Sequence, residues 1–368
     1  MNAMKIPAAL LFLAALAPLH ATLDDSLQSL VSIEREGRGN EAASAAWRDV
    51  VKAGPSAIAS LLASAGKGSE VADNWLRLAG DVIVENATKS GQPLPLAALT
   101  SFIADTKHVP AGRMMAFDLL KRADAAKADE VETTLVQDPV QALRRGAVQR
   151  LIDSAKNKTG DELKAAYLEA LAAVRDEDQT AFLAGELKKL DVSVDLPRHF
   201  GFLMKWDIIG PFDNTGRKGF DAVFPPEKEV KLDAAYEGKG AQVKWQPFDS
   251  KDEHGKLDFN KPLGLQKETV AYAATTFDSA TDRDAELRLG TKNAWKVWIN
   301  GKLLFARDEY HRGQEMDQYK LKCHLNQGPN VILVKCCQDE QKEQWTVEWE
   351  FQLRVCDSTG TAILSAAK

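Results

Sequence analysis

The sequence predicts a chain of two parts, helices first, as an α-solenoid or helical bundle, and then an antiparallel β-sandwich. From Leu23 to Leu190, apolar residues recur about every 3.6 residues in segments rich in Ala and Leu. Near Asp191–Pro197 this period changes to two, and tryptophan and glycine turns become frequent. In the second part, WKVWINGKLLF (Trp295–Phe305) reads as two strands joined by Asn300-Gly301. Both turn residues tolerate the positive φ of a type I′ hairpin.

The N-terminus has the pattern of a signal peptide. Lys5 supplies the positive charge, Ile6–Ala17 is the apolar stretch, and Ala21 stands where cleavage is expected. The apolar stretch is too short for a bilayer span, and no second one follows. We therefore expect a signal segment over 1–21, helices over 22–195 and a sandwich over 196–368. The protein is expected to be periplasmic or secreted, without a membrane span after cleavage.

Charge excludes two classes of partner. The formal net charge is -6 at pH 7. A nucleic-acid-binding surface needs an excess of Lys and Arg to displace counterions from phosphates. In this chain Asp and Glu outnumber Lys and Arg. An anionic membrane surface is disfavoured for the same reason.

The helical part has one distinctive start. Asp138-Pro139 is the pattern of an N-cap followed by proline at the first helical position. Arg144-Arg145, in the same helix, is open to three interpretations: a ligand clamp, a solvated face, or salt bridges between neighbouring helices. Leu163–Leu190 is predicted to form a helical hairpin. Further helices are expected at Asn40–Ala53, Pro55–Ala65, Trp75–Ile83, Leu94–Ile103, Arg113–Arg122 and Asp129–Val136.

The strand-rich part contains period-two segments separated by turns. Val331–Cys337 is apolar nearly throughout, as in a central strand buried on both faces. Trp345–Val355 alternates apolar and polar residues, which predicts one core face and one solvent face. Other strands are expected at Phe202–Ile209, Val243–Phe248, Val270–Phe277, Ala285–Leu289, Trp295–Ile299, Leu303–Ala306 and Tyr319–Leu325.

All four cysteines lie late in the chain. Cys336 and Cys337 are adjacent, so in a strand their side chains point to opposite faces and do not form a zinc pattern with the others. Cys323 and Cys356 complete the set, and either free thiols or one disulfide is expected.

Two resemblances follow from quoted segments. GPSAIASLL and DPVQALRRGAVQRLI resemble HEAT-repeat helices. LRLGTKNAWKVWINGKLL and the G-x-N-x-I-L-V-K segment beginning at Gly328 resemble a galactose-binding-like jelly roll. This combination is similar to exported multidomain proteins of planctomycete- and verrucomicrobia-like bacteria, and the resemblance implies a carbohydrate-binding module. Lys292-Asn293 stands where the family often has acidic residues, so no calcium site is assigned.

The sequence lacks recognisable catalytic motifs. Its six histidines make no H-E-x-x-H or Cys/His ligand spacing, and there is no G-x-S-x-G, Walker A or strand-linked G-x-G-x-x-G. We therefore expect a protein that is not an enzyme and takes no cofactor or metal.

Candidate ligand contacts lie in three loops expected at one end of the sandwich. Aromatic rings stack on the C–H faces of sugars, while amide, carboxylate and Arg groups bond hydroxyls. The candidates are Asp213, Asn214, Asp221, Lys292, Asn293, Trp295, Arg307, Tyr310 and His311. Convergence of Trp295, Tyr310 and Asn214 in one exposed cleft is the structural test. The remaining sandwich tryptophans are assigned to the core: Trp206, Trp245, Trp298, Trp345 and Trp349.

The hairpin strand carries an aromatic on each face, Trp295 on one and Trp298 on the other. This predicts a strand covered on both faces, with any binding in the loops that it holds.

Three functions remain open. The first is an exported, non-catalytic protein whose jelly roll binds carbohydrate. The second is an adaptor in which both parts, including the helical region, bind protein partners. The third is a glycan hydrolase with an unrecognised site.

Overall fold

The computed structural model describes residues 22–34, 36 and 38–366, so the predicted signal segment lies outside the described residues. The chain divides into two compact units, Met1–Asp138 and Pro139–Lys368. The first strand begins at Lys205, after helix α11 (Leu196–Phe200), so the change from helices to strands lies inside the second unit. Of the described helices, none combines the length and hydrophobicity that a membrane span requires.

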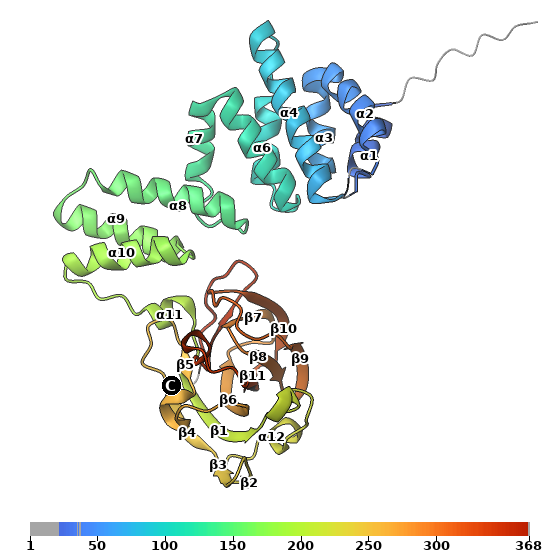
Figure 1. The fold of residues 1–368 in the computed structure, drawn as a ribbon. Helices are drawn as coiled ribbons and strands as arrows, with labels where there is room; N and C mark the ends of the chain where they lie inside the picture. Colours follow the sequence, from blue (N-terminus) through green and yellow to red (C-terminus); the bar gives the residue numbers. More distant parts are fainter. Residues whose placement is uncertain (1–21, 35, 37, 367–368) are drawn as a thin grey trace, which may run out of the picture. The chain divides into compact units, whose positions relative to one another are not determined.

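The first unit is built from helices (Figure 1). They are α1 (Leu23–Val31), α2 (Asn40–Ala53), α3 (Ile58–Ser64), α4 (Glu70–Ser90), α5 (Leu96–Ala104), α6 (Pro110–Ala123) and α7 (Ala125–Thr133). Side chains satisfy free amides at three helix starts: Thr22 and Asp25 form a capping box on α1, Ser69 caps α4 and Asp124 caps α7. One stripe of α4 is buried, including Leu76 and Ile83, as the periodicity predicts.

Asp138 is not the N-cap residue of the next helix. Helix α8 spans Gln141–Ala155, and its N-cap residue Val140 makes no side-chain cap bond. The Asp138 carboxylate instead accepts both terminal nitrogens of Arg113, whose side chain is 1% exposed. Leaving a buried guanidinium without a charged partner costs more free energy than leaving a helix start without a cap. The N-cap prediction is wrong.

Helices α8, α9 (Gly160–Ala173) and α10 (Glu177–Lys189) run side by side (Figure 1). The Arg145 guanidinium donates to both oxygens of Asp178 in α10 at 2.7 and 2.6 Å. This is the inter-helix salt bridge among the three interpretations. Arg144 is buried and donates to the Thr359 carbonyl oxygen at 3.0 Å. Both guanidinium groups therefore hold parts of the fold together. A short helix, α11 (Leu196–Phe200), leads into the strands.

The strands form two larger antiparallel sheets and one small ribbon. The six-stranded sheet has the order β4 (Gln246–Asp249), β1 (Lys205–Asp213), β6 (Thr269–Ser279), β11 (Gly328–Gln338), β8 (Ala294–Ile299), β9 (Lys302–Arg307). The four-stranded sheet has the order β10 (Tyr319–Leu325), β7 (Arg283–Thr291), β12 (Glu350–Cys356), β5 (Leu257–Asp258). The ribbon pairs β2 (Ala235–Glu237) with β3 (Gln242–Lys244). Between β8 and β9, Asn300 and Gly301 have φ of 50° and 76°, which confirms the predicted hairpin turn.

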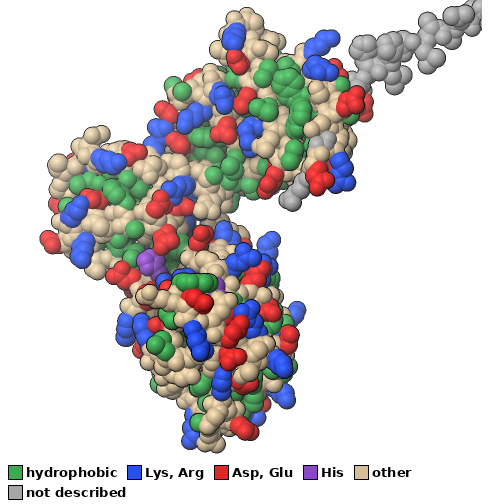
Figure 2. Space-filling model, in the orientation of Figure 1, with side chains coloured by type: hydrophobic (Ala, Val, Ile, Leu, Met, Phe, Trp, Pro, Cys, Tyr) green, Lys and Arg blue, Asp and Glu red, His purple; other side chains and the backbone are tan. Residues whose placement is uncertain are grey.

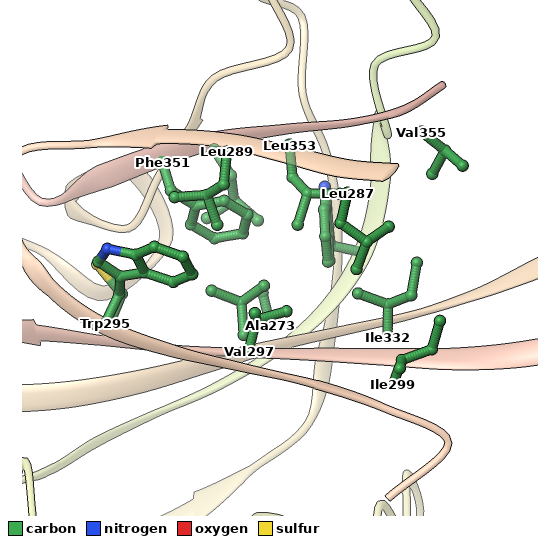
Figure 3. Close-up of a cluster of buried hydrophobic side chains, with 14 of the residues drawn as sticks. Ala273, Leu287, Leu289, Trp295, Val297, Ile299, Ile332, Phe351, Leu353 and Val355 are labelled. Carbon is green, nitrogen blue, oxygen red and sulfur yellow. The ribbon is translucent and has the colours of Figure 1, made fainter. Parts of the chain in front are cut away.

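The main core lies between the two sheets. In Figure 3, Trp295 and Val297 from β8 point toward Leu289 and Leu353 of the four-stranded sheet. Trp295 is 0% exposed, and Trp298, which faces the other side of β8, is 7% exposed. The prediction that this strand is covered on both faces is confirmed.

The last strand differs from its prediction. Its strand conformation begins at Glu350, not at Trp345. Gln352 and Arg354, expected to face solvent, are 5% and 1% exposed. Segments distant in sequence cover this face, and Arg354 donates to both oxygens of Asp317 at 2.6 Å. Period two identifies the faces of a strand, but it does not reveal what covers them.

A second, smaller core covers the outer face of the six-stranded sheet. The segment between β1 and β3 folds over this face and contains α12 (Pro225–Lys228). The packed residues from both sides include Ile209, Phe220, Phe224, Val230, Tyr236, Tyr272, Trp298, Leu333 and Cys337. All four cysteines are free thiols, and Cys336 and Cys337 lie in different cores, on opposite faces of β11.

Candidate functional site

Strand register brings the predicted loops to one end of the six-stranded sheet. Asp213 at the end of β1 lies opposite Thr269 at the start of β6, and Thr269 also lies opposite Gln338 at the end of β11. Cys337 pairs with Ala294, the first residue of β8. The segments after Asp213, before Ala294 and after Gln338 therefore leave the sheet together, at what we call the loop end.

Buried amide side chains tie these loops to one another. Asn214, 0% exposed, donates from Nδ2 to the Tyr310 hydroxyl at 3.1 Å and to the Gln338 carbonyl at 2.9 Å. Asn293, 1% exposed, donates from Nδ2 to the Glu348 carbonyl at 3.2 Å. Because both side chains are buried and bonded to other loops, Asn214 and Asn293 hold these loops in position.

The carboxylate of Asp339 is the electrostatic centre of the loop end. It is fully buried and accepts His311 Nε2 at 2.9 Å and Arg217 Nη2 at 3.0 Å. The backbone amide of His311 donates to the Lys292 carbonyl, which joins two of the predicted loops. Two donors that carry or can carry positive charge offset the cost of burying this carboxylate.

Arg217 connects the buried centre with the surface. Its guanidinium lies 4.9 Å from the centroid of the Tyr310 ring and donates to both oxygens of Glu340 at 3.1 and 2.8 Å. The hydrogen bond from Arg217 lowers the pKa of the Glu340 carboxyl. Burial raises the pKa of the Tyr310 phenol, which therefore stays neutral.

Trp345 is the exposed aromatic ring at this end. It is 61% exposed and meets the His311 ring edge-on, with centroids 5.2 Å apart and planes at 82°. Its backbone is firmly held, since the next residue, Thr346, is fully buried and donates to the carbonyl oxygens of Gln341 and Glu343 at 2.9 and 2.7 Å. A fixed backbone with an exposed indole is the geometry of a stacking platform. The assignment of Trp345 to the core is wrong.

The structure brings seven of the nine predicted site residues to the loop end. Asn214, Tyr310, His311, Lys292 and Asn293 are joined by the contacts above, and Asp213 ends β1 beside them. Arg307 ends edge strand β9 opposite Trp295, the neighbour of Ala294, and pairs with Glu309 at 2.7 Å. Lys292 also forms an ion pair with Glu348. The hydrogen bond from Thr215 lowers the pKa of the exposed Asp213 carboxyl.

Two predicted residues are placed otherwise. Trp295 fills the core between the sheets, because β8 alternates and turns this side chain inward, so its role as a ligand contact is corrected. Asp221 is exposed in the segment that follows β1. The test set of Trp295, Tyr310 and Asn214 therefore does not form one exposed cleft.

Sequence reasoning missed five residues of the loop end: Arg217, Asp339, Glu340, Trp345 and Glu348. A signal for three of them was present, because QDEQKEQ (Gln338–Gln344) is polar at every position and directly precedes Trp345. Such a run predicts a loop, and a tryptophan at its end belongs to that loop rather than to the strand beyond it.

Charge at the surface is mixed. On the face of the β-rich part visible in Figure 2, basic and acidic side chains are interspersed. Among the described residues, no group of three or more His, Cys, Asp or Glu side chains is arranged to hold a metal ion.

Comparisons with known proteins give distant structural similarity only. Neither a protein-family model nor a curated protein matches the sequence. A family 35 carbohydrate-binding module from Clostridium thermocellum is 13% identical over 28% of this chain and 92% of its own, with a TM-score of 0.18. A β-glucosidase from Kluyveromyces marxianus, solved with glucose, is 9% identical over 63% of this chain and 34% of its own, with a TM-score of 0.29. TM-scores this low do not establish a shared overall fold.

Proposed function

We propose that the β-sandwich binds carbohydrate at its loop end. The observation that carries the proposal is Trp345, an indole 61% exposed on a firmly held backbone. Removing a flat apolar ring from contact with water is favourable in free energy. The C–H face of a sugar is flat and apolar and can cover such a ring. Tryptophan is enriched at interfaces, where one part of its side chain meets an apolar partner and another stays wet.

Polar groups around the ring match the rest of a sugar. Arg217, Glu340, Lys292 and Glu348 are all partly exposed and supply donors and acceptors for hydroxyl groups. These four side chains already form two ion pairs, so their positions are set before a ligand arrives. A preorganised site loses less conformational entropy on binding.

We propose further that the site binds without catalysis. Glycoside hydrolysis uses a carboxylic acid whose pKa is raised so that it keeps its proton near neutral pH. At the loop end the Arg217 hydrogen bond acts in the opposite direction on Glu340, whose pKa is lowered. This argues against Glu340 as the acid of a hydrolase.

A protein partner is the second candidate, and the helical unit supplies the observation. It is built from packed helices, an architecture that offers extended surfaces to protein partners, and it exposes Leu78 at 56% and Met114 at 38%. The corresponding test is a pull-down with the full chain and with Leu78→Asp, in which a stoichiometric partner is recovered only by the unchanged protein.

Export is part of the proposed function, because extracellular polysaccharides are the ligands such a site would meet. Mass spectrometry of the protein recovered from its own host is expected to find the mature N-terminus directly after Ala21. An intact Met1 on the recovered protein would contradict export by this signal.

Native affinity electrophoresis tests the binding itself. The full chain is run through gels that contain cell-wall, algal or plant polysaccharides, beside a non-binding protein of similar mass. Retardation in at least one gel is expected. Migration equal to that of the reference protein in every gel would count decisively against carbohydrate binding.

A further inference from the structure

A pocket lies on the outer face of the six-stranded sheet, beside the hairpin turn. It has a volume of about 290 Å³ and lies between α12 with the residues after it and the strands β8 and β11. Asn300 and Gly301 of the turn close one side. The predicted loop residues do not contribute to this pocket, so it is separate from the loop end.

The floor of the pocket is apolar and partly aromatic. Trp298 on β8 and Leu333 on β11 are directly opposite each other in register, and their outward-facing side chains are 7% and 4% exposed. Val331, two residues before Leu333 on the same face, is 36% exposed. The segment that covers the rest of this face stops short here, which leaves an indole and two aliphatic side chains to line a hollow.

One wall of the pocket is fixed by a buried ion pair. Lys335, 0% exposed, donates from Nζ to Glu227 Oε1 at 2.8 Å and to the carbonyl oxygens of Phe220 and Ala222 at 2.9 and 2.8 Å. The Tyr272 hydroxyl donates to the same Glu227 oxygen at 2.5 Å. Glu227 belongs to α12, so these bonds hold the helix against the sheet and keep the pocket open in one shape.

The rim of the pocket is polar and charged. Lys228 and Glu229 are exposed beside the pocket. The side chain of Asn300, on the turn across from them, donates to Asn330 and accepts from the Val331 amide, which fixes this side of the rim. An ammonium group and a carboxylate can each bond a hydroxyl. An apolar floor with a charged rim suits a ring that is apolar on one face and hydroxylated at its edge.

We propose that this pocket is a second carbohydrate site that holds one sugar ring of the glycan bound at the loop end. This inference rests on the proposed function. Ligand pockets usually measure roughly 300–1,000 Å³, so a volume of about 290 Å³ has room for a single ring. Val331 and Asp339 lie near opposite ends of β11, roughly 26 Å apart along an extended strand. The two sites are therefore independent, and a long glycan that reaches both binds with added avidity.

Fluorine NMR of the full chain labelled with 5-fluorotryptophan reads the two sites separately. Replacement of Trp298 and of Trp345 by Phe, one at a time, assigns their resonances. The labelled protein is then titrated with cellohexaose, xylohexaose and mannohexaose. With at least one of these probes, both resonances are expected to shift and to give saturable curves.

Two variants at exposed valines control the result. Val331→Arg fills the pocket, and it is expected to reduce the Trp298 shift at least tenfold while the Trp345 shift is unchanged. Val223→Arg adds the same charge at a residue that is 63% exposed and outside the pocket, and it is expected to change neither shift.

The outcomes distinguish the two proposals. If Trp345 shifts and Trp298 does not, the second site is wrong and the loop-end site stands. If Trp298 shifts and Trp345 does not, the pocket binds sugar and the loop-end proposal is wrong. If neither shifts with any hexasaccharide, both are wrong. A Trp298 shift that persists in Val331→Arg also overturns the assignment of the pocket.

Discussion

His311 Nε2 lies 2.9 Å from both carboxylate oxygens of Asp339, and Asp339 is fully buried. Because a carboxylate only accepts hydrogen bonds, Nε2 carries the proton. This contact fixes the imidazole ring on which the edge of Trp345 rests. The buried carboxylate of Asp339 therefore sets, through His311, the surface against which the exposed indole packs.

Asp339→Asn is expected to loosen the loop end. The amide keeps the shape but removes the charge that holds His311 and Arg217, at a cost of about 1.5–3 kcal/mol in the free energy of unfolding. Urea unfolding followed by tryptophan fluorescence measures this loss. Glu340→Gln is the control, because Glu340 is 49% exposed and its removal costs about 0–1 kcal/mol. Equal stability of the two variants would show that the buried carboxylate has no special role.

His199, in α11, gives the stability a dependence on pH. Burial, and then the charge of Arg175, lowers the pKa of His199 to about 4. In the unfolded chain this pKa is about 6.5, so between pH 6.5 and pH 4 the unfolded state binds a proton that the folded state does not. The histidine is therefore expected to reduce stability as the pH falls through this window, and to have no such effect above it.

His199→Gln isolates this contribution. Between pH 7 and pH 4.5 the variant is expected to lose about 1–3 kcal/mol less unfolding free energy than the unchanged protein. Urea titrations at three pH values measure the difference. Parallel stability profiles for the two proteins would contradict a lowered pKa at His199.

Asp138→Ala distinguishes a buried ion-pair partner from an N-cap. Loss of a cap costs about 1 kcal/mol, whereas an uncompensated buried Arg113 costs about 3–5 kcal/mol. Circular dichroism during urea unfolding measures the loss, with Ser69→Ala as the control at a true N-cap. In Arg113→Met/Asp138→Leu the charge is removed from both partners, and most of the stability is expected to return. A loss no larger than that of Ser69→Ala would restore the capping role.

Local rules were sufficient where a feature depends on neighbouring residues. The Asn300-Gly301 turn, the strand Tyr319–Leu325 and the opposite directions of Cys336 and Cys337 all follow from spacing and backbone preference, and the structure has each of them. The order of helices before strands follows from periodicity in the same way.

Rules of this kind failed where distant segments decide the outcome. Trp345 continues the alternation of the last strand by chance, but Thr346 and Gln338 anchor it in a loop. Arg354 alternates like a solvent-facing residue, yet it is covered and paired with Asp317, far away in sequence. The loop-end candidates were predicted from the chemistry of their side chains. Burial then distinguishes the amides that position the loops from the exposed side chains that can contact a ligand. Burial depends on the folded chain, so the sequence did not predict this distinction.

The central claim is that Trp345 binds carbohydrate, and the polysaccharide affinity of Trp345→Ala tests it most directly. The polysaccharide that retards the full chain is used, and the dissociation constant is measured by affinity electrophoresis for the unchanged protein, for Trp345→Ala and for Leu232→Ala. Leu232 is also exposed, at 51%, but lies outside the loop end. We predict a dissociation constant raised about tenfold or more in Trp345→Ala, about 1.4 kcal/mol, with Leu232→Ala unchanged. Unaltered affinity in a folded Trp345→Ala would contradict the account.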